Sequence, residues 1–417
     1  MRVAAALTFA VVASLGPRSA HAQATVLPAE AGSLDAERHE LAGFPIVGGN
    51  TDIGVQLGGA ATLTRFHDGL LPYLWNVDLL LSASIKSDSS GVRLVQQSHV
   101  LRLDAPHLLN DRVRIDVRAS FQRTVDAHYY GIGNASSATP PDATQGAARH
   151  FEYLQEEARV RTIARVHTGT LFDLALGGNA RYEMPQTYAG SKLEEDSAAS
   201  NPVRGATPAG LLGIAAGVII DTRDTEFVTR SGYYYQLGAG YTLGTAGVAA
   251  YANTSAVLAH YAPIGGPFVF AQRFVASLEA GRVPFYDQQQ GGSFEPQNLL
   301  GGESGVRGVP QGRYAGLIKA ITNIEIRATL PRFVLFKQRL RFGTTTFFDA
   351  GRVWSDYAVD PARDGSKLGL KYGVGGGIFL QWGEAAIFRV EAAYSPDAAA
   401  ENPSFPVGIY VADGLMF

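Results

Sequence analysis

Residues 299–314 read Leu-Leu-Gly-Gly-Glu-Ser-Gly-Val-Arg-Gly-Val-Pro-Gln-Gly-Arg-Tyr. This glycine-rich stretch has neither a helical nor a strand period, and it separates two long segments in which apolar and polar residues alternate. It therefore predicts a long loop with Arg307 near its centre, and a loop of this length in a compact fold is usually functional or disordered. The glycines favour a tightly turned backbone. An arginine held in a dry or narrow place needs an anionic partner.

On both sides of this loop, the chain consists of segments with the two-residue period of β-strands. In the segment 112–125, for example, Val113 and Ile115 fall on one face, and Arg114 and Asp116 fall on the other. Sixteen such segments are predicted, an even number as a single-chain bacterial outer-membrane barrel requires. They span 41–49, 53–66, 73–87, 92–104, 112–125, 150–166, 171–185, 209–223, 232–244, 248–262, 267–283, 315–330, 338–353, 367–382, 384–395 and 405–417.

The lengths of the connections separate a membrane barrel from a soluble sandwich, whose strands also alternate but bury their apolar face against a second sheet. With both termini in the periplasm, the long connections all fall on the extracellular side, and the connections on the other side are mostly short. The predicted fold is therefore all-β, a transmembrane antiparallel β-barrel of about 16 strands over residues 41–417. The long connections are 126–149, 186–208, 284–314, 354–366 and 396–404.

Composition and the N-terminal residues agree with export to the outer membrane. Charged residues make up only 18% of the chain, and it contains 48 Gly, 18 Tyr and 21 Phe but no Cys, which excludes disulfides and thiolate metal sites. Residues 1–22 resemble a secretory signal peptide with a cleavage site near Ala22, and residues 23–40 resemble a flexible periplasmic tail. Removing the signal takes away two of the 35 basic residues and leaves the 38 acidic ones, so the mature net charge is −5. This balance gives no argument for nucleic-acid binding.

Two acidic residues downstream are candidate partners for Arg307. Glu325 shares a strand face with Asn323 and Arg327, and Asp349 lies in the segment Phe347-Phe348-Asp349-Ala350-Gly351. Their parity predicts that both carboxylates point into the barrel. The planar guanidinium of Arg307 can bond two carboxylates at once, which would pin the loop inside the lumen.

These three segments resemble the BamA/TamA superfamily of outer-membrane proteins, also called the bacterial surface antigen family. Members carry a V-R-G-[FY] motif in the sixth extracellular loop, which folds back into the barrel. There the arginine meets an acidic residue on the next strand and the aspartate of an F-x-D-x-G segment on the one after. Arg307, Glu325 and Asp349 match these positions one by one, whereas Val309 departs from the usual aromatic residue.

The resemblance implies a loop-six latch made of Val306, Arg307 and Gly308, with lumenal partners Glu325, Asp349 and Gly351. It is a resemblance to a barrel-only member, because no room for periplasmic POTRA repeats is found between the signal and the first strand. A short first strand beside the terminal strand predicts a weak seam. In the family, such a seam is implicated in letting polypeptide pass sideways into the membrane.

Two further sites are expected at the periplasmic end of the barrel. Asp221, Arg223 and Asp224 resemble the family's D-x-R-D turn and are interpreted as a structural network. Gly414 and Phe417 resemble the terminal signal that outer-membrane barrels present to the assembly machinery.

The resemblance thus implies that the protein acts in the bacterial outer membrane, in protein insertion, translocation or envelope biogenesis. Outer-membrane lipid, the barrel assembly machinery and client polypeptides are the implied partners. A passive solute channel and a surface-exposed structural barrel stay open as alternatives. An enzyme is not expected, because Gly302-Glu303-Ser304-Gly305 lacks the spacing and the strand-to-helix setting of a nucleophile elbow. No cofactor is expected, since the histidines lack paired metal spacing.

Overall fold

The computed structural model describes residues 37–417 apart from positions 52, 69, 71–72, 89–90, 140–148, 170, 336–337, 383–385 and 402–404. These residues form one antiparallel sheet that closes on itself, because each strand pairs with its neighbours along the chain and the first strand also pairs with the last. β14 and β15 pair in succession with the same strand, β16, so the barrel has sixteen strand positions. The prediction of a sixteen-stranded antiparallel barrel is confirmed.

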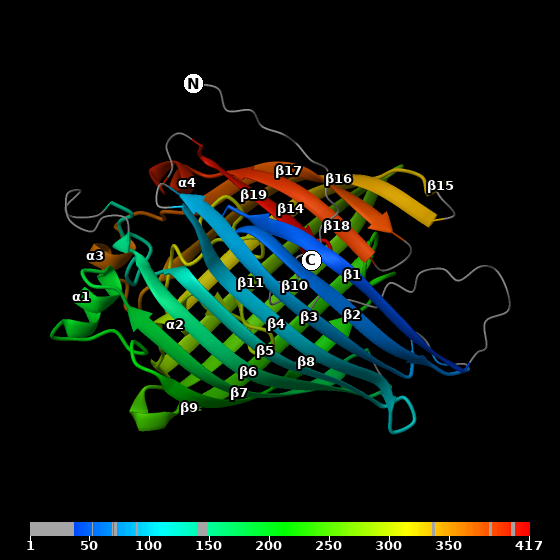
Figure 1. Cartoon of the computed structure of the whole chain (residues 1–417), viewed down its shortest axis with the longest axis horizontal. Coiled ribbons are helices and arrows are strands. Elements are labelled where there is room, and N and C mark those ends of the chain that lie inside the picture. Colours follow the sequence, from blue (N-terminus) through cyan, green and yellow to red (C-terminus); the bar gives the residue numbers. More distant parts are fainter. Residues whose placement is uncertain are drawn as a thin grey trace.

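Figure 1 shows the strands running obliquely across the barrel, with the short helices α1 and α3 gathered at one end. The barrel strands are β1 (Arg38–Asn50), β2 (Gly54–Phe66), β3 (Trp75–Asp88), β4 (Gly91–Leu108), β5 (Val113–His128), β6 (Glu152–His167), β7 (Asp173–Thr187), β8 (Ala209–Asp221), β9 (Gly232–Gly244), β10 (Ala250–Gly265), β11 (Phe268–Arg282), β14 (Ile318–Thr329), β15 (Phe333–Leu335), β16 (Gln338–Trp354), β17 (Lys371–Trp382), β18 (Ala386–Tyr394) and β19 (Val407–Asp413). The connections contain α1 (Lys192–Ala198), η2 (Thr245–Gly247), α2 (Phe285–Gln288), β12 (Gln290–Gly291), β13 (Gln297–Asn298), α3 (Pro361–Asp364) and α4 (Pro396–Glu401).

Alternation along the strands sorts the side chains to the two faces of the wall. On β4, Leu101 and Leu103 are exposed on the outside, whereas Arg102 and Asp104 between them are buried on the inside. Outward apolar side chains suit lipid, and inward polar ones suit a lumen. Within the described residues, none of the helices has the length and hydrophobicity needed to cross a lipid bilayer.

An aromatic cluster joins three of the long connections at the end of the barrel that is predicted to be extracellular. Tyr129 from the β5–β6 connection, Leu193 in α1, and Phe285 and Tyr286 in α2 pack with Tyr153 of β6, and all five are buried. We call this cluster the extracellular cap. It brings together segments that are more than 150 residues apart in the sequence.

The two strands that close the barrel differ from expectation. β1 is not short: it begins at Arg38, three residues before the predicted start, and it pairs with β2 from Arg38↔Phe66 to Asn50↔Gly54. The short strand is the terminal one, β19, with 7 residues. The predicted signal peptide and most of the predicted tail lie in residues 1–36, outside the described residues.

The chain end is also corrected. A strand over 405–417 was expected, but β19 ends at Asp413, and Gly414 turns the chain with a positive φ of 69°. Leu415 then packs inside the barrel with Val228 of the β8–β9 connection, and the Phe417 ring lies 6.1 Å from that of Tyr261. The last four residues leave the sheet because their apolar side chains find partners at the periplasmic end of the lumen.

Candidate functional site

Loop six, residues 283–317 between β11 and β14, lies inside the barrel and has its own apolar core. Val306, Leu299, Leu300 and Val309 are buried together against Ile321 of the wall and its neighbours. A backbone hydrogen bond from Val306 N–H to the Leu299 carbonyl, at 2.9 Å, closes the glycine-rich turn. Valine at the family's usual aromatic position therefore still packs, since Val309 is fully buried.

Arg307 projects from this turn into a fully buried acidic site. Its Nε lies 2.7 Å from Asp349 Oδ2, and its Nη2 lies 3.0 Å from Asp349 Oδ1, which is a two-point contact. Its Nη1 lies 2.8 Å from Glu325 Oε1 and 3.0 Å from Glu391 Oε1. The guanidinium carbon is 3.4 Å from the centroid of the Phe347 ring. The structure thus brings Arg307, Glu325 and Asp349 together.

The charges around Arg307 balance. Glu325 also pairs with Arg327 of β14 at 2.7 Å, and Glu391 also pairs with Arg389 of β18. Three arginines thus face three carboxylates, and none of the six side chains is more than 2% exposed. Burial by itself would lower the pKa of Arg307, but the adjacent carboxylates outweigh burial and raise its pKa well above the usual value. We call these six residues, Arg307, Arg327, Arg389, Glu325, Asp349 and Glu391, the lumenal ion network.

Sequence reasoning missed three residues of this site. Glu391 supplies the third carboxylate, and Asn323 Nδ2 donates to Asp349 Oδ1 and to the Gly305 carbonyl, each at 2.9 Å. Tyr410 of β19 accepts a hydrogen bond from Gly308 N–H at 2.8 Å. Parity on β18, where Glu391 shares a face with Arg389, was the available signal for Glu391. No local pattern points to Tyr410.

Glycines make the close approach of loop and wall possible. A Cβ on Gly373 of β17 would lie 1.7 Å from the Arg307 carbonyl oxygen, and Gly308 has a φ of 90°. Gly351, the expected partner of the latch, leaves room for Leu300 of loop six, whose Cδ1 would lie 3.1 Å from a Cβ at that position.

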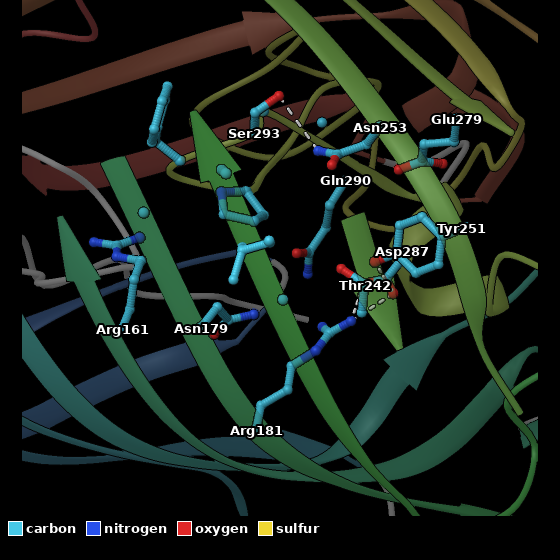
Figure 2. A pocket seen from close by; sticks show the side chains of 18 of the residues that line it. Arg161, Asn179, Arg181, Thr242, Tyr251, Asn253, Glu279, Asp287, Gln290 and Ser293 are labelled. Atoms are coloured by element: carbon cyan, nitrogen blue, oxygen red, sulfur yellow. Dashed lines mark hydrogen bonds and ion pairs between the residues drawn. The ribbon is translucent and has the colours of Figure 1, made fainter. Parts of the chain in front are cut away.

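The N-terminal part of loop six, far from Arg307 in the sequence of the loop, is held by the carboxylate of Asp287. Asp287 in α2 forms an ion pair with Arg181 of β7 and accepts a hydrogen bond from Tyr251 of β10 at 2.7 Å. Figure 2 shows these three side chains converging beside a pocket of about 50 Å³ between loop six and the wall. Neither Arg181 nor Asp287 belongs to a recognisable motif, so sequence reasoning missed this second anchor.

A third ion pair lies between the two anchors. Glu295 Oε1 of loop six is 3.3 Å from Arg161 Nη2 of β6. Burial raises the pKa of the Glu295 carboxyl, and Arg161 opposes that shift. The adjacent Phe294 packs on glycine backbone, because a Cβ on Gly238 would lie 2.8 Å from its ring. Loop six is therefore fixed to walls on both sides of the lumen.

The seam between β1 and β19 is the weakest junction of the barrel among the described residues. It has two register pairs, Gly49↔Val411 and Asn50↔Tyr410, and a hydrogen bond from Thr51 N–H to the Ile409 carbonyl at 3.2 Å. On their other sides, β1 pairs with β2 along its whole length, and β19 pairs with β18 from Val407 to Asp413. Loop six reaches this seam through the bond from Gly308 to Tyr410.

The predicted periplasmic turn is a compact polar network. Arg223 Nε and Nη2 donate to the two carboxylate oxygens of Asp221 at 2.9 and 2.8 Å. Asp224 Oδ1 accepts the backbone N–H of Arg230 at 3.0 Å. These contacts lie within the turn and its strand ends, as a structural role requires.

Phe417, predicted as part of an assembly signal, lies beneath the lumenal ion network. Its carbonyl oxygen accepts a hydrogen bond from Arg327 Nη2 at 2.8 Å, and its ring lies under the guanidinium groups of Arg327 and Arg273. Arg327 therefore connects the chain segment after β19 to Glu325, and through Glu325 to Arg307. Within the described residues, no cluster of three or more His, Asp or Glu could hold a metal ion.

Comparisons with known proteins agree with this architecture. Two solved structures share the fold: BamA from Haemophilus ducreyi lacking POTRA domains 1–3 (TM-score 0.53, 15% identity) and CdiB from Escherichia coli (TM-score 0.53, 15% identity). The match covers 91% of this chain and 70% of the BamA chain, and 90% of this chain and 62% of the CdiB chain. CdiB from Acinetobacter baumannii matches at a TM-score of 0.51 and 12% identity, over 91% of this chain and 60% of its own. Among curated proteins, none matches the sequence significantly.

The family assignment rests on the sequence itself. The profile described as the Omp85 superfamily domain matches residues 92–403, which is most of the chain and includes loop six and both acidic strands that receive Arg307. The resemblance to the BamA/TamA group and the sixteen-stranded barrel with its weak seam agree with that match. The chain belongs to the Omp85 superfamily.

Proposed function

We propose that this protein resides in the bacterial outer membrane and moves polypeptides into or across that membrane through its lumen and its β1–β19 seam. Loop six acts as a latch in this proposal. The observation that carries it is the direct connection between latch and seam: Arg307 bonds β16, β14 and β18, and the adjacent Gly308 bonds Tyr410 of β19. Displacing loop six would therefore remove contacts from the strand that must move for the seam to open.

A passive solute channel is the second candidate, and the geometry argues against it. A channel needs a continuous aqueous path. Here loop six places its own apolar core inside the barrel, and the extracellular cap joins three of the long connections at one end. A latched lumen fits a protein that opens for a client, and client polypeptides are the partners we propose.

The test uses a reversible lock on the seam. Thr51 and Ile409 are exposed residues opposite each other across the seam. Adjacent antiparallel Cα atoms lie about 4.5–5.5 Å apart, which a disulfide can span. The chain has no cysteine, so Thr51→Cys with Ile409→Cys gives a single bridge. Val55→Cys with Ile85→Cys, an exposed pair on β2 and β3, is the matched control.

Proteoliposomes holding each variant receive a urea-unfolded small outer-membrane barrel, and folding is followed by heat-modifiable migration on gels. We expect the wild type and the control pair to accelerate folding, the oxidised seam pair to lose the acceleration, and reduction to restore it. Equal activity of the locked and unlocked seam would contradict the proposal, as would a wild type no faster than empty liposomes.

A further inference from the structure

A row of uncharged polar side chains crosses five strands on the inner wall. Gln56 of β2 lies opposite Ser84 of β3, Ser84 opposite Gln96 of β4, Gln96 opposite Thr124 of β5, and Thr124 opposite Gln155 of β6. Residues in register across antiparallel strands share one face and one level of the sheet. The row therefore forms a belt of amides and hydroxyls that crosses the inner wall perpendicular to the strands, in a lumen whose other rows carry mostly ion pairs.

Loop six presents four more glutamines to this belt. Gln289, Gln290, Gln297 and Gln311 line a cavity of about 140 Å³, and its opposite wall contains four glutamines of β2, β4, β5 and β6. Eight of the seventeen glutamines in the chain therefore line one cavity. We call it the glutamine cavity. Such a concentration is unusual for a lumen that needs only to be wet, because serine, threonine or paired charges serve that purpose equally well.

The hydrogen bonds of the cavity leave acceptors unused. Gln56 Nε2 donates to Ser82 Oγ at 2.8 Å, and Gln289 Nε2 donates to the His128 carbonyl at 2.8 Å. Among the described residues that line the cavity, Gln56 Oε1 and Asp126 Oδ1 have no hydrogen-bond partner, although Gln56 is only 4% exposed. A buried acceptor without a partner costs about 1–3 kcal/mol. Arg159 Nε on the same wall is a buried donor without a hydrogen-bond partner, so the cavity favours a ligand that brings both donors and acceptors.

Charge and size narrow the class of ligand. The charged residues on the cavity wall already have partners, since Asp126 pairs with Lys86 at 2.7 Å and Glu157 pairs with Arg159. An ionic ligand would find no free countercharge among these pairs. The volume equals that of about five water molecules at roughly 30 Å³ each. It suits a compact group such as a sugar ring, whereas an extended chain needs an exit at each end.

We propose that the glutamine cavity binds a neutral saccharide, whose hydroxyl groups donate to the amide oxygens of the belt and accept from the amide N–H groups. Ile53, in the connection between β1 and β2, lines the cavity, so the cavity reaches that end of the lumen near the seam. This site goes beyond the proposed transport of polypeptides. Its test measures binding and does not depend on loop-six release.

The experiment is saturation-transfer-difference NMR on the refolded full barrel in a sugar-free detergent. The probes are lactose, its acid analogue lactobionate, and hexaglycine as a mimic of peptide main chain. We expect lactose to give a signal and lactobionate and hexaglycine to give little. Lactosylceramide in the same micelles tests whether the cavity prefers a lipid-linked sugar to a free one. If it does, lactosylceramide should displace lactose at a concentration far below that of the free lactose.

Substitutions of the glutamines test whether the lactose signal comes from the glutamine cavity. Replacing Gln56, Gln96 and Gln155 together by Leu removes three hydrogen-bonding groups, and we expect at least about a tenfold rise in the lactose concentration for half-maximal signal. Gln96→Leu alone, in case the triple variant does not fold, should raise that concentration about threefold to tenfold. Gln97→Leu is the matched control, since Gln97 is adjacent in sequence but shares its face with exposed Leu101.

Three results would overturn the proposal. A signal from hexaglycine but not from lactose would make the peptide main chain the occupant. No signal from any probe would mean that the belt holds only water. A lactose signal that is the same in the triple variant, or lost equally in Gln97→Leu, would place the sugar elsewhere on the protein.

Discussion

Replacing Arg307 by alanine should release loop six from the β14–β18 side of the lumen. The side chain is fully buried and bonds three carboxylates that are themselves at most 1% exposed. Its removal leaves the three carboxylates of the lumenal ion network with two of its three arginines, Arg327 and Arg389. Taking one partner from a buried ion pair costs about 3–5 kcal/mol. The ratio of docked to undocked loop should therefore fall by about two to three and a half orders of magnitude.

Planar-bilayer conductance of the refolded barrel reports this change. We expect the wild type to be nearly closed with brief flickers and Arg307→Ala to show long-lived open events. Arg307→Lys should fall between them, because an ammonium group keeps the charge but loses the two-point contact with Asp349. Arg363→Ala is the control, since its side chain is 55% exposed in α3 and far from the latch in sequence. A steady open wild type, or identical traces for wild type and Arg307→Ala with both migrating as folded barrels, would refute the latch.

Three further variants test other contacts of loop six by the same measurement. Tyr410→Phe leaves the buried N–H of Gly308 without an acceptor, at a cost of about 1–3 kcal/mol, so we expect more frequent flickers but no stable open state. Arg181→Ala leaves Asp287 as a buried charge without its partner. Combined with Arg307→Ala, it should open the barrel further than either change alone. Gly373→Ala places a methyl group 1.7 Å from the position of the Arg307 carbonyl oxygen, so we expect the folded variant to show the same open events as Arg307→Ala. A folded variant whose pore stays closed would show that β17 shifts to make room for the methyl group.

The strands could be predicted from the sequence because alternation is a local property. Each strand needs only its own residues to sort apolar side chains outward, so β5, β14 and β16 were located within a few residues of their observed bounds. The same parity placed Glu325 and Asp349 on the inner face, where the structure has them buried. The number of strands followed from these local decisions.

The remaining features depend on pairs that are distant in sequence. Tyr410 meets Gly308 across 102 residues, and Arg181 meets Asp287 across 106, so no window of sequence contains both partners. The end of β19 was misjudged for the same reason. Its apolar residues continue the strand pattern, but Leu415 gains more by packing against Val228, which belongs to a connection on another part of the wall.

The energies of these contacts decide what keeps the barrel closed. The seam is held by two register pairs and the bond from Thr51 to Ile409, and about three backbone hydrogen bonds at about 0.5–1.5 kcal/mol each contribute about 1.5–4.5 kcal/mol in total. Removing one partner from either buried ion-pair anchor of loop six, at Arg307 or at Asp287, costs about 3–5 kcal/mol. Opening should therefore be limited by the release of loop six. Because Gly308 bonds the seam strand directly, the loop must move before β19 can, and weakening the seam alone should change the closed state less than losing either anchor.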